Sequence, residues 1–340
     1  MDLDEHNIEV EKPDNTYNKD KYMDIEILEK AREYGTLVTK DKLMRVIARS
    51  EGIAVEDYKN DKVNEVYKGH TEVFCEDGQI DDIYNTGELE MEHDHFTENQ
   101  FVNIKNGQQS ALTLYQDGKL RLIADKMVHG IQGKNKEQVY ALNALMSKNI
   151  ELVTLTGQAG TGKTLCAIAS ALEQVLELER YKKFNVARPI KIMGDNDLGF
   201  MPGDKDEKLD LFMQPVFDSI EFLYNTNPRE IITELKDRNK FNMESLGHIR
   251  GRTLQNQFIL IDEAQNTNIH EISTILTRIG KGSKVVLTGD INQIDLYYLD
   301  RQSNGLSYVV NNFKGQDNFC HINLEKSERS KLARQSAKLL

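Results

Sequence analysis

The stretch Gly157-Gln158-Ala159-Gly160-Thr161-Gly162-Lys163-Thr164 decides the fold that we expect for this 340-residue chain. It matches the pattern G-x-x-x-x-G-K-[ST], in which glycines let backbone N–H groups turn inward around phosphate oxygens. Lys163 would place a positive charge on the β- and γ-phosphates, and the hydroxyl of Thr164 would bind Mg²⁺. An apolar run precedes the stretch and a helical pattern follows it, so the positive end of a helix would face the same anion. The motif therefore predicts a loop that binds the phosphates of a nucleotide.

Strands and helices alternate on both sides of this loop. Continuous apolar runs predict strands at 152–156, 184–187, 258–261, 284–288 and 320–324. Helical patterns lie between them at 164–179, 209–224 and 270–279. Apolar strands joined by helical crossovers are typical of a parallel sheet that is buried on both faces. The sequence therefore predicts an α/β domain with a parallel sheet.

Two acids follow the predicted strand at 258–261. Asp262 and Glu263 stand where a buried strand would deliver its last side chains to the carboxyl edge of the sheet. We expect Asp262 to hold Mg²⁺ and Glu263 to polarise the attacking water. The alternative is that the two acids only solvate the end of the strand.

A third polar group follows the predicted strand at 284–288. Gly289 and Asp290 come first, and Gln293 follows them closely. The amide of Gln293 could reach the γ-phosphate of a nucleotide bound at the same edge of the sheet. Taken alone, these residues would be explained equally well by an ordinary turn after a strand.

Composition indicates a folded chain without a membrane segment. Hydrophobic residues make up 39% and charged residues 29% of the sequence, as in soluble globular proteins. No apolar run reaches the roughly 18 residues of a membrane span. Cys75, Cys166 and Cys320 lie too far apart for a disulfide framework or a zinc-binding pair. We therefore expect a reducing, cytoplasmic compartment.

The negative charge of the chain is concentrated in its first third. The formal net charge is −12, and residues 1–100 hold 27 of the 55 acids but only 12 of the 43 Lys and Arg residues. The rest of the chain is nearly neutral and could present basic patches. The overall charge therefore does not exclude a nucleic-acid partner.

Two regions lie ahead of the predicted β-hairpins and the P-loop. Residues 1–70 alternate in the order αβαβ, which suggests a parallel sheet with too few strands for a core of its own. Residues 71–100 are rich in acids and lack Lys and Arg, which predicts a solvated linker. His93 and His95 fall in this stretch, and we interpret them as solvated side chains rather than as metal ligands.

The remainder of the chain is expected to form two further regions. Residues 101–128 hold short strands separated by Asn106-Gly107 and Asp117-Gly118, which are typical of β-hairpin turns. Residues 129–340 would form the α/β domain that carries the P-loop.

Several short stretches of residues 129–340 resemble the PhoH-like ATPases, in the order that this family shows. The resembling stretches are Leu155-Thr-Gly-Gln-Ala-Gly-Thr-Gly-Lys-Thr164, Ala187-Arg-Pro189, Leu198-Gly-Phe-Met-Pro-Gly203 with Glu207-Lys208, Ile249-Arg-Gly-Arg-Thr253, Asp262-Glu-Ala-Gln-Asn266, and Leu276-Thr-Arg-Ile-Gly280 continuing to Thr288-Gly-Asp290. The resemblance implies a RecA-like ATPase domain related to the first motor domain of superfamily 1 helicases.

The same resemblance implies roles for three further residues. Gln138, in Asn135-Lys-Glu-Gln138, is similar to the glutamine that reads adenine. Gln293 is similar to the motif that couples ATP to nucleic acid. Arg329, in Glu328-Arg-Ser330, is similar to the arginine that reaches the γ-phosphate. The alternatives are an amide on a helix surface for Gln138 and a surface salt bridge for Arg329.

The resemblance also implies an assembly. A superfamily 1 helicase holds ATP between two RecA-like domains, and this sequence ends at Leu340, shortly after Arg329. We therefore expect a homo-oligomeric ring, a hexamer by resemblance to RecA-like motors, with nucleotide sites between subunits. A basic residue of the neighbour, Arg329 or alternatively Arg252 or Arg278, would complete each site. Arg329 could instead serve the nucleotide of its own subunit.

The first region has a shorter resemblance, to the last half of a PIN ribonuclease domain. It rests on Asp24-Ile-Glu-Ile-Leu28, Leu37-Val-Thr-Lys-Asp41 and Val55-Glu-Asp-Tyr58. PIN nucleases gather several acids around divalent metal, and Asp24 and Asp41 match two of these while the earlier acids are absent. We therefore expect no nuclease activity from this chain alone. The segment would be a remnant docking surface or a half that a separate polypeptide completes.

Together these patterns predict an α/β protein with a P-loop domain that hydrolyses ATP with Mg²⁺. The PhoH resemblance adds coupling to RNA or to single-stranded nucleic acid. One alternative is a kinase that passes the γ-phosphoryl group to an acceptor, although Glu263 beside Asp262 favours water over a bound hydroxyl. Another is an interaction module that holds a nucleotide without turning it over.

Overall fold

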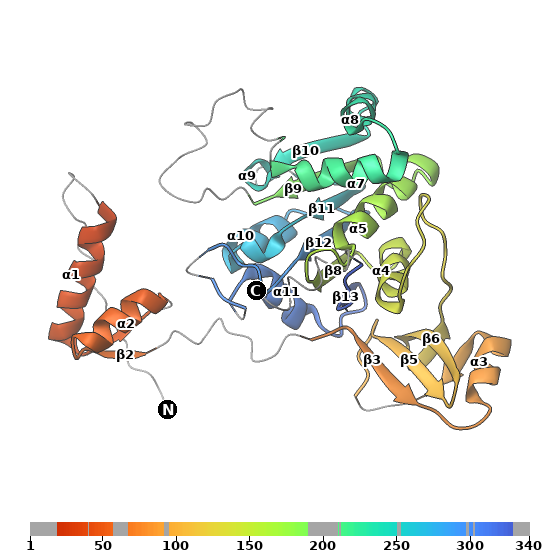
Figure 1. The fold of residues 1–340 in the computed structure, drawn as a ribbon, viewed down its shortest axis with the longest axis horizontal. Coiled ribbons are helices and arrows are strands. Elements are labelled where there is room, and N and C mark those ends of the chain that lie inside the picture. The colour runs from red at the N-terminus through yellow and green to blue at the C-terminus, as the bar shows by residue number, and fades with distance from the viewer. Residues whose placement is uncertain are drawn as a thin grey trace. The chain divides into compact units, whose positions relative to one another are not determined.

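The chain folds into two compact units, Met1–Asn60 and Asp61–Leu340 (Figure 1). The computed structural model describes residues 19–39, 41–56, 67–91, 95–189, 210, 212–249, 253–296, 299–301 and 303–328. None of the helices in these ranges is long and apolar enough to cross a membrane.

The first unit has the αβαβ order that the sequence predicts. Its elements are α1 (Lys19–Tyr34), β1 (Thr36–Val38), α2 (Lys42–Ser50) and β2 (Ala54–Glu56), and the two strands pair in parallel. Leu28, Leu37, Met44 and Ile53 contribute to its small core. The carboxylate of Asp41 caps α2 by accepting hydrogen bonds from the backbone of residues 43 and 44 at 2.7 and 3.0 Å. The side chain of Asp24 lies outside the described residues, so the PIN resemblance stays a prediction.

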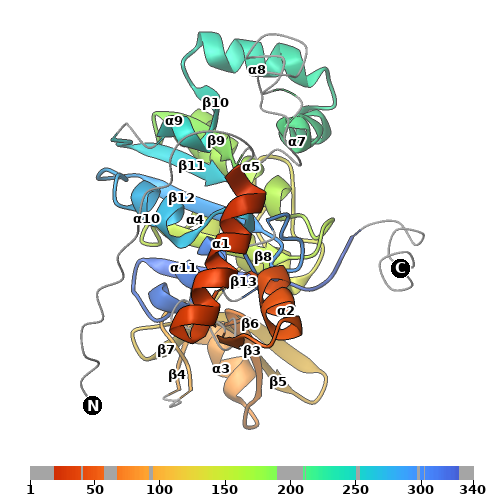
Figure 2. The same ribbon diagram turned by 90° about the vertical axis from the view of Figure 1, so that its left-hand side faces the viewer.

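The second unit is built on a parallel six-stranded sheet. Its strands are β8 (Leu152–Gly157), β9 (Lys183–Arg188), β10 (Phe241–Ser245), β11 (Gln257–Ile261), β12 (Lys284–Gly289) and β13 (Phe319–Leu324). They lie in the order β10-β9-β11-β12-β8-β13, with every neighbouring pair parallel. Figure 2 shows this order from top to bottom. The five strands predicted from apolar runs are confirmed, and the sequence analysis missed only the edge strand β10 among the strands of this sheet.

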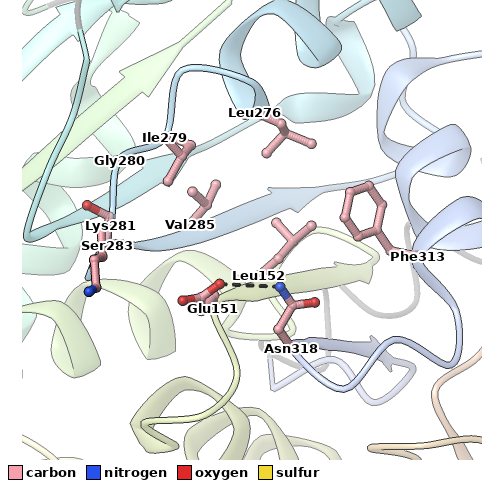
Figure 3. A pocket seen from close by; sticks show the side chains of 10 residues that line it. All are labelled: Glu151, Leu152, Leu276, Ile279, Gly280, Lys281, Ser283, Val285, Phe313 and Asn318. Carbon is pink, nitrogen blue, oxygen red and sulfur yellow. Dashed lines mark hydrogen bonds between the residues drawn. The ribbon is translucent and has the colours of Figure 1, made fainter.

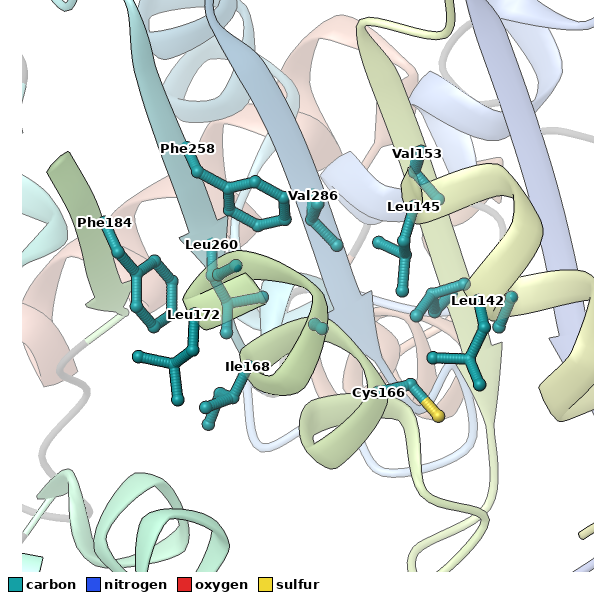
Figure 4. Close-up of a cluster of buried hydrophobic side chains, with 14 of the residues drawn as sticks. Leu142, Leu145, Val153, Cys166, Ile168, Leu172, Phe184, Phe258, Leu260 and Val286 are labelled. Carbon is teal, nitrogen blue, oxygen red and sulfur yellow. The ribbon is translucent and has the colours of Figure 1, made fainter. Parts of the chain in front are cut away.

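Helices cover both faces of this sheet. They are α4 (Lys136–Met146), α5 (Lys163–Leu172), α7 (Gln214–Tyr224), α8 (Pro228–Asp237), α9 (Leu246–Ile249), α10 (Ile269–Leu276) and α11 (Gly305–Phe313). Side chains of α4, α5, α7 and α8 share one hydrophobic cluster with the sheet, and those of α9, α10 and α11 share another. In Figure 4, Ile168 and Leu172 of α5 lie among Phe184, Phe258 and Leu260 of the strands. A π-helical turn, η1 (Glu173–Glu177), continues α5.

The acidic stretch 71–100 is not the linker that the sequence predicts. It contributes β3 (His70–Phe74), α3 (Gln79–Thr86) and β4 (Glu88–Glu90) to a second sheet with β5 (Phe101–Asn106), β6 (Gln109–Gln116) and β7 (Lys119–Leu122). The strand order is β3-β5-β6-β7-β4. The predicted hairpins form its centre, since β5 pairs antiparallel with β6, and β6 with β7.

Lysines from later strands explain why so acidic a stretch can fold. Lys105 of β5 lies 2.7 Å from Glu72, and Lys119 of β7 lies 2.6 Å from Glu88. Hydrogen bonds from Lys105 and Lys136 hold the pKa of Glu72 at about 2. The apolar residues between the acids, Ile80 and Ile83 among them, are buried. His93 lies outside the described residues, and within the described part of the chain no three or more His, Cys, Asp and Glu residues are grouped so that they could hold a metal ion by themselves.

The five-stranded sheet packs directly on the P-loop domain. The ring of Phe101 stacks on that of Tyr140 in α4, with centroids 4.6 Å apart. Asn99 donates to the carbonyl of residue 317 at 2.8 Å, ahead of β13. Gly69, at φ 77°, lies so close to β13 that an added Cβ would fall 1.7 Å from the carbonyl oxygen of His321. The sheet is therefore an integral layer of the second unit.

Replacing Gly69 with alanine should destabilise this junction. A Cβ at positive φ costs roughly 1–2 kcal/mol, and here it would also push β13 away from β3. Gly78→Ala is the matched control, because Gly78 has φ 87° but nothing within 4 Å of the added Cβ. We expect the unfolding midpoint of Gly69→Ala to lie at least about 4 °C below that of Gly78→Ala. Equal midpoints would contradict the tight packing of Gly69 on β13.

Candidate functional site

The P-loop leaves the sheet at Gly157 and enters α5 at Lys163, as the motif predicts. Gly157 has φ 142°, and a Cβ there would lie 2.2 Å from the carbonyl oxygen of Leu324 in β13. The hydroxyl of Thr161 closes the loop by donating to the carbonyl of Gln158 at 2.9 Å. A glycine is therefore required at the start of the loop by its close approach to the neighbouring strand.

The side chain of Lys163 folds over the loop. Its Nζ donates to the carbonyl oxygens of Gly157 and Gln158, at 2.7 and 2.9 Å. These two bonds hold the ammonium group against the backbone at the start of the loop. The loop thus presents a positive charge and the positive end of a helix to the same space.

The carboxylate of Asp262 joins three strands. Its Oδ1 accepts hydrogen bonds from Thr164 Oγ1 at 3.0 Å and from Thr288 Oγ1 at 2.6 Å. Asp262 follows β11, Thr288 belongs to β12, and Thr164 follows the loop after β8. Because these strands are adjacent and parallel, their carboxyl ends bring the three residues together.

Two buried carboxylate oxygens at this edge of the sheet have no hydrogen-bond partner in the described structure, Asp262 Oδ2 and Asp290 Oδ2, and Arg188 Nε lies 3.3 Å from the first of them. Asp262 is 3% and Asp290 is 4% exposed, and both line the same cavity. Unsatisfied carboxylate oxygens beside a threonine hydroxyl are the donor set that Mg²⁺ prefers. The residues present therefore fit a divalent cation.

Glu263 follows Asp262 in a left-handed backbone conformation, with φ 57°. Its Oε2 accepts a hydrogen bond from Gln265 Nε2 at 2.6 Å. Gln265 also donates to the carbonyl of Gln293 at 2.9 Å and accepts from the backbone N–H of Asp290 at 3.1 Å. Gln265 thus ties the acids after β11 to the turn after β12, a role that sequence reasoning missed although the residue lies in a family stretch.

A cavity of about 310 Å³ lies between these groups. The P-loop, Asp262, Glu263, Asp290 and Gln293 line one side, and residues 215, 218 and 219 of α7 line another. A second hollow lies at the opposite edge of the sheet, beside Leu152 and Val285 (Figure 3). Leu276, Ile279 and Gly280 of one family stretch line it, but no residue of the P-loop and neither of the acids after β11 does, so we place the site at the carboxyl edge.

Gln138 is buried against the P-loop and is not an amide on a helix surface. Its Nε2 donates to the carbonyl of Thr161 at 3.0 Å, and its Oε1 accepts from the backbone N–H of Lys134 at 2.9 Å. Asn135 caps α4 one turn earlier by accepting from the backbone N–H of Gln138 at 3.0 Å. These bonds give Gln138 a supporting role at the loop, which competes with the reading of adenine that the resemblance implies.

Of the three arginines expected to complete the site, Arg278 is the one within the described residues. Arg329 and Arg252 lie outside the described residues, and Arg278 is exposed after α10. The residue before Arg329 contacts the loop of its own chain, because the backbone N–H of Glu328 donates to the carbonyl of Gly160 at 3.0 Å. Asn135 also donates to the Glu328 carboxylate at 2.8 Å.

The parallel sheet, the loop between β8 and α5 and the acid after β11 define a RecA-like P-loop nucleoside-triphosphatase fold. The sequence model of a family described as "PhoH-like protein" matches residues 130–340. The chain belongs to the PhoH-like family.

Relatives from three bacteria illustrate the similarity. Protein PhoH2 of Bacillus subtilis (strain 168) is 43% identical over 318 residues, which cover 89% of this chain and 72% of that protein. Protein PhoH2 of Mycolicibacterium smegmatis is 35% identical over 302 residues, covering 88% and 68%. A PhoH-like protein of Synechocystis sp. is 40% identical over 169 residues, covering 49% of each chain. The similarity to PhoH2 extends beyond the P-loop domain.

The contacts of Gln138 predict how its loss would affect nucleotide binding. Gln138→Ala removes the bond to Thr161 of the loop and the bond to Lys134 ahead of α4, so we expect ATP and GTP to bind about tenfold more weakly, each to the same extent. Calorimetric titration with the two nucleotides measures this. Asn143→Ala is the control, because Asn143 bonds the carbonyl of Ala124 from the same helix at 2.9 Å, away from the loop. A loss confined to ATP would show instead that Gln138 reads adenine.

Proposed function

We propose that this chain hydrolyses ATP with Mg²⁺ and couples the hydrolysis to RNA or single-stranded nucleic acid. The observation that carries the proposal is the Asp262 carboxylate, which bonds the P-loop threonine through one oxygen and leaves the other buried and without a hydrogen bond. That oxygen lies 3.3 Å from Arg188 Nε but accepts no hydrogen bond in the described structure, whereas most buried carboxylate oxygens do. The arrangement supports a site built for a cation beside a phosphate loop.

Each residue of the site has a part in this proposal. The loop N–H groups and Lys163 bind and orient the β- and γ-phosphates, and Thr164 and Asp262 would hold Mg²⁺. The cation would neutralise charge on the phosphate oxygens when bound. Glu263, half-exposed at the cavity, would orient a water and accept its proton. Gln293 would report the state of the γ-phosphate, since its backbone is tied to Glu263 through Gln265.

The nucleic-acid partner is supported by family membership rather than by a described surface. The PhoH-like family resembles the first motor domain of superfamily 1 helicases. The turn that carries Gln293 is similar to the motif that couples ATP to nucleic acid in those helicases. The P-loop half of the chain is also close to neutral. The kinase and the non-hydrolysing module remain as alternatives.

The ring remains a proposal that sedimentation of the purified chain would test. Glu328 lies on the P-loop of its own chain. This contact supports the arrangement in which Arg329 serves the nucleotide of the same subunit.

Two substitutions should separate binding from turnover. Lys163→Ala removes the cation of the loop, so we expect nucleotide affinity to fall at least about 100-fold. Glu263→Gln keeps the shape of the side chain but cannot accept a proton, so turnover should fall about 100-fold or more while affinity stays within about threefold. Equilibrium binding and phosphate release measure the two effects. Equal loss of binding in both variants would count against these roles.

Phosphate release against a panel of RNA and DNA strands tests the coupling. We expect release to depend on Mg²⁺ and to rise several-fold with RNA or single-stranded DNA, because the partner would favour the hydrolysis-competent state. The chain carrying Glu263→Gln is the control for contaminating phosphatases. Nucleotide retained without phosphate release would support the non-hydrolysing module, and release that no strand changes would remove the nucleic-acid part.

A further inference from the structure

Arg188, the last residue of β9, reaches across the carboxyl edge of the sheet to both acids of the site. Its Nε lies 3.3 Å from Asp262 Oδ2, and its Nη2 lies 3.1 Å from Glu263 Oε1. Its Nη1 donates to the carbonyl oxygen of Phe212. All three guanidinium nitrogens are therefore engaged. Arg188 belongs to a family stretch, Ala187-Arg-Pro189, to which the proposed chemistry gives no role.

The position of Arg188 answers an electrostatic need. Asp262 and Glu263 are consecutive carboxylates, and the side chain of Asp262 is only 4% exposed. Burying a carboxylate without a compensating charge is strongly unfavourable. The side chain of Arg188 is itself only 15% exposed, so solvent screens this contact poorly. Arg188 is thus the cation that the described structure places against both acids.

The contact with Asp262 balances charge but does not satisfy its oxygen. Asp262 Oδ2 lies within ion-pair distance of Arg188 Nε, yet in the described structure it receives no hydrogen bond. The guanidinium group therefore stabilises the Asp262 carboxylate less than a well-aligned bidentate pair would. A small cation that coordinates Asp262 Oδ2 directly could displace the guanidinium group with little loss of free energy.

We propose that Arg188 is an internal counter-ion, which neutralises Asp262 and Glu263 while the site is empty and yields Asp262 when a divalent cation binds. This inference rests on the proposed function, since it assumes that Asp262 is a metal ligand. Arg188 is a positioning residue that acts through the two acids. The positive charge of Arg188 weakens the binding of Mg²⁺ alone. The cation therefore binds tightly only together with the phosphates of a nucleotide. Until then, Glu263 stays paired and does not engage water.

The test uses MgCl₂ alone, without nucleotide, and reads the unfolding midpoint of the full chain. Wild type should change little between excess chelator and 10 mM MgCl₂, because Arg188 already compensates the acids. Arg188→Gln leaves them uncompensated, so its midpoint should be lower in chelator and should rise by about 4 °C or more with Mg²⁺. The apparent Mg²⁺ affinity should be at least about tenfold higher than that of wild type.

Three further variants make the result decisive. Arg188→Lys keeps the charge and should behave like wild type. Arg238→Gln breaks an exposed pair with Glu234 on α8 and reports the general effect of Mg²⁺. Adding Asp262→Asn to Arg188→Gln should abolish the Mg²⁺ response.

Several outcomes would overturn the proposal. One is an Arg188→Gln chain whose unfolding midpoint rises no more with Mg²⁺ than that of Arg238→Gln. Another is an Arg188→Lys chain that responds as strongly as the Gln variant, and a third is a response that survives Asp262→Asn. Because no nucleotide is present, these results do not depend on whether the chain hydrolyses ATP. The loss of binding in Lys163→Ala tests that function separately.

Discussion

The hydrogen bonds that the Asp262 carboxylate accepts from Thr164 and Thr288 hold the site together. These residues are far apart in the sequence and meet because β8, β12 and β11 are adjacent and parallel. The packing around them leaves little freedom: a Cβ on Gly289 would lie 2.3 Å from the side-chain oxygen of Gln265. A shift of β12 would therefore disturb the P-loop, the acids and the turn after β12 together.

Strand β13, which pairs with β8 on the side away from β12, connects the P-loop to the five-stranded sheet. His321 of β13 is fully buried, with its ring nitrogens 2.7 and 3.4 Å from the hydroxyls of Thr154 and Thr156 in β8. Burial lowers the pKa of His321 to about 3, so the imidazole is neutral at physiological pH. Gly69 packs on the backbone of the same residue. The P-loop, β13 and the five-stranded sheet thus form one continuous packed layer.

The sequence predicts the features that depend on neighbouring residues. It does not predict those that depend on contacts between residues far apart in the chain. Apolar runs and glycine spacing suffice for the P-loop and five strands, because each depends on neighbouring residues. The acids of 71–100 predict a linker when they are read alone, because their lysine partners follow only later in the chain. Gln265 and Arg188 lie in stretches that resemble the family, but the local pattern assigns them no role, since their importance lies in contacts with the turn after β12 and with the acids after β11. The edge strand β10 was missed because polar residues interrupt its apolar ones.

The central claim is that the carboxyl edge of the sheet holds one nucleotide together with one divalent cation. Calorimetric titration of the purified chain with a non-hydrolysable ATP analogue tests it most directly, since it needs neither turnover nor a nucleic acid. The account predicts one nucleotide bound per chain, with an affinity that Mg²⁺ raises at least about tenfold. Absence of binding, or binding that Mg²⁺ leaves unchanged, would contradict it.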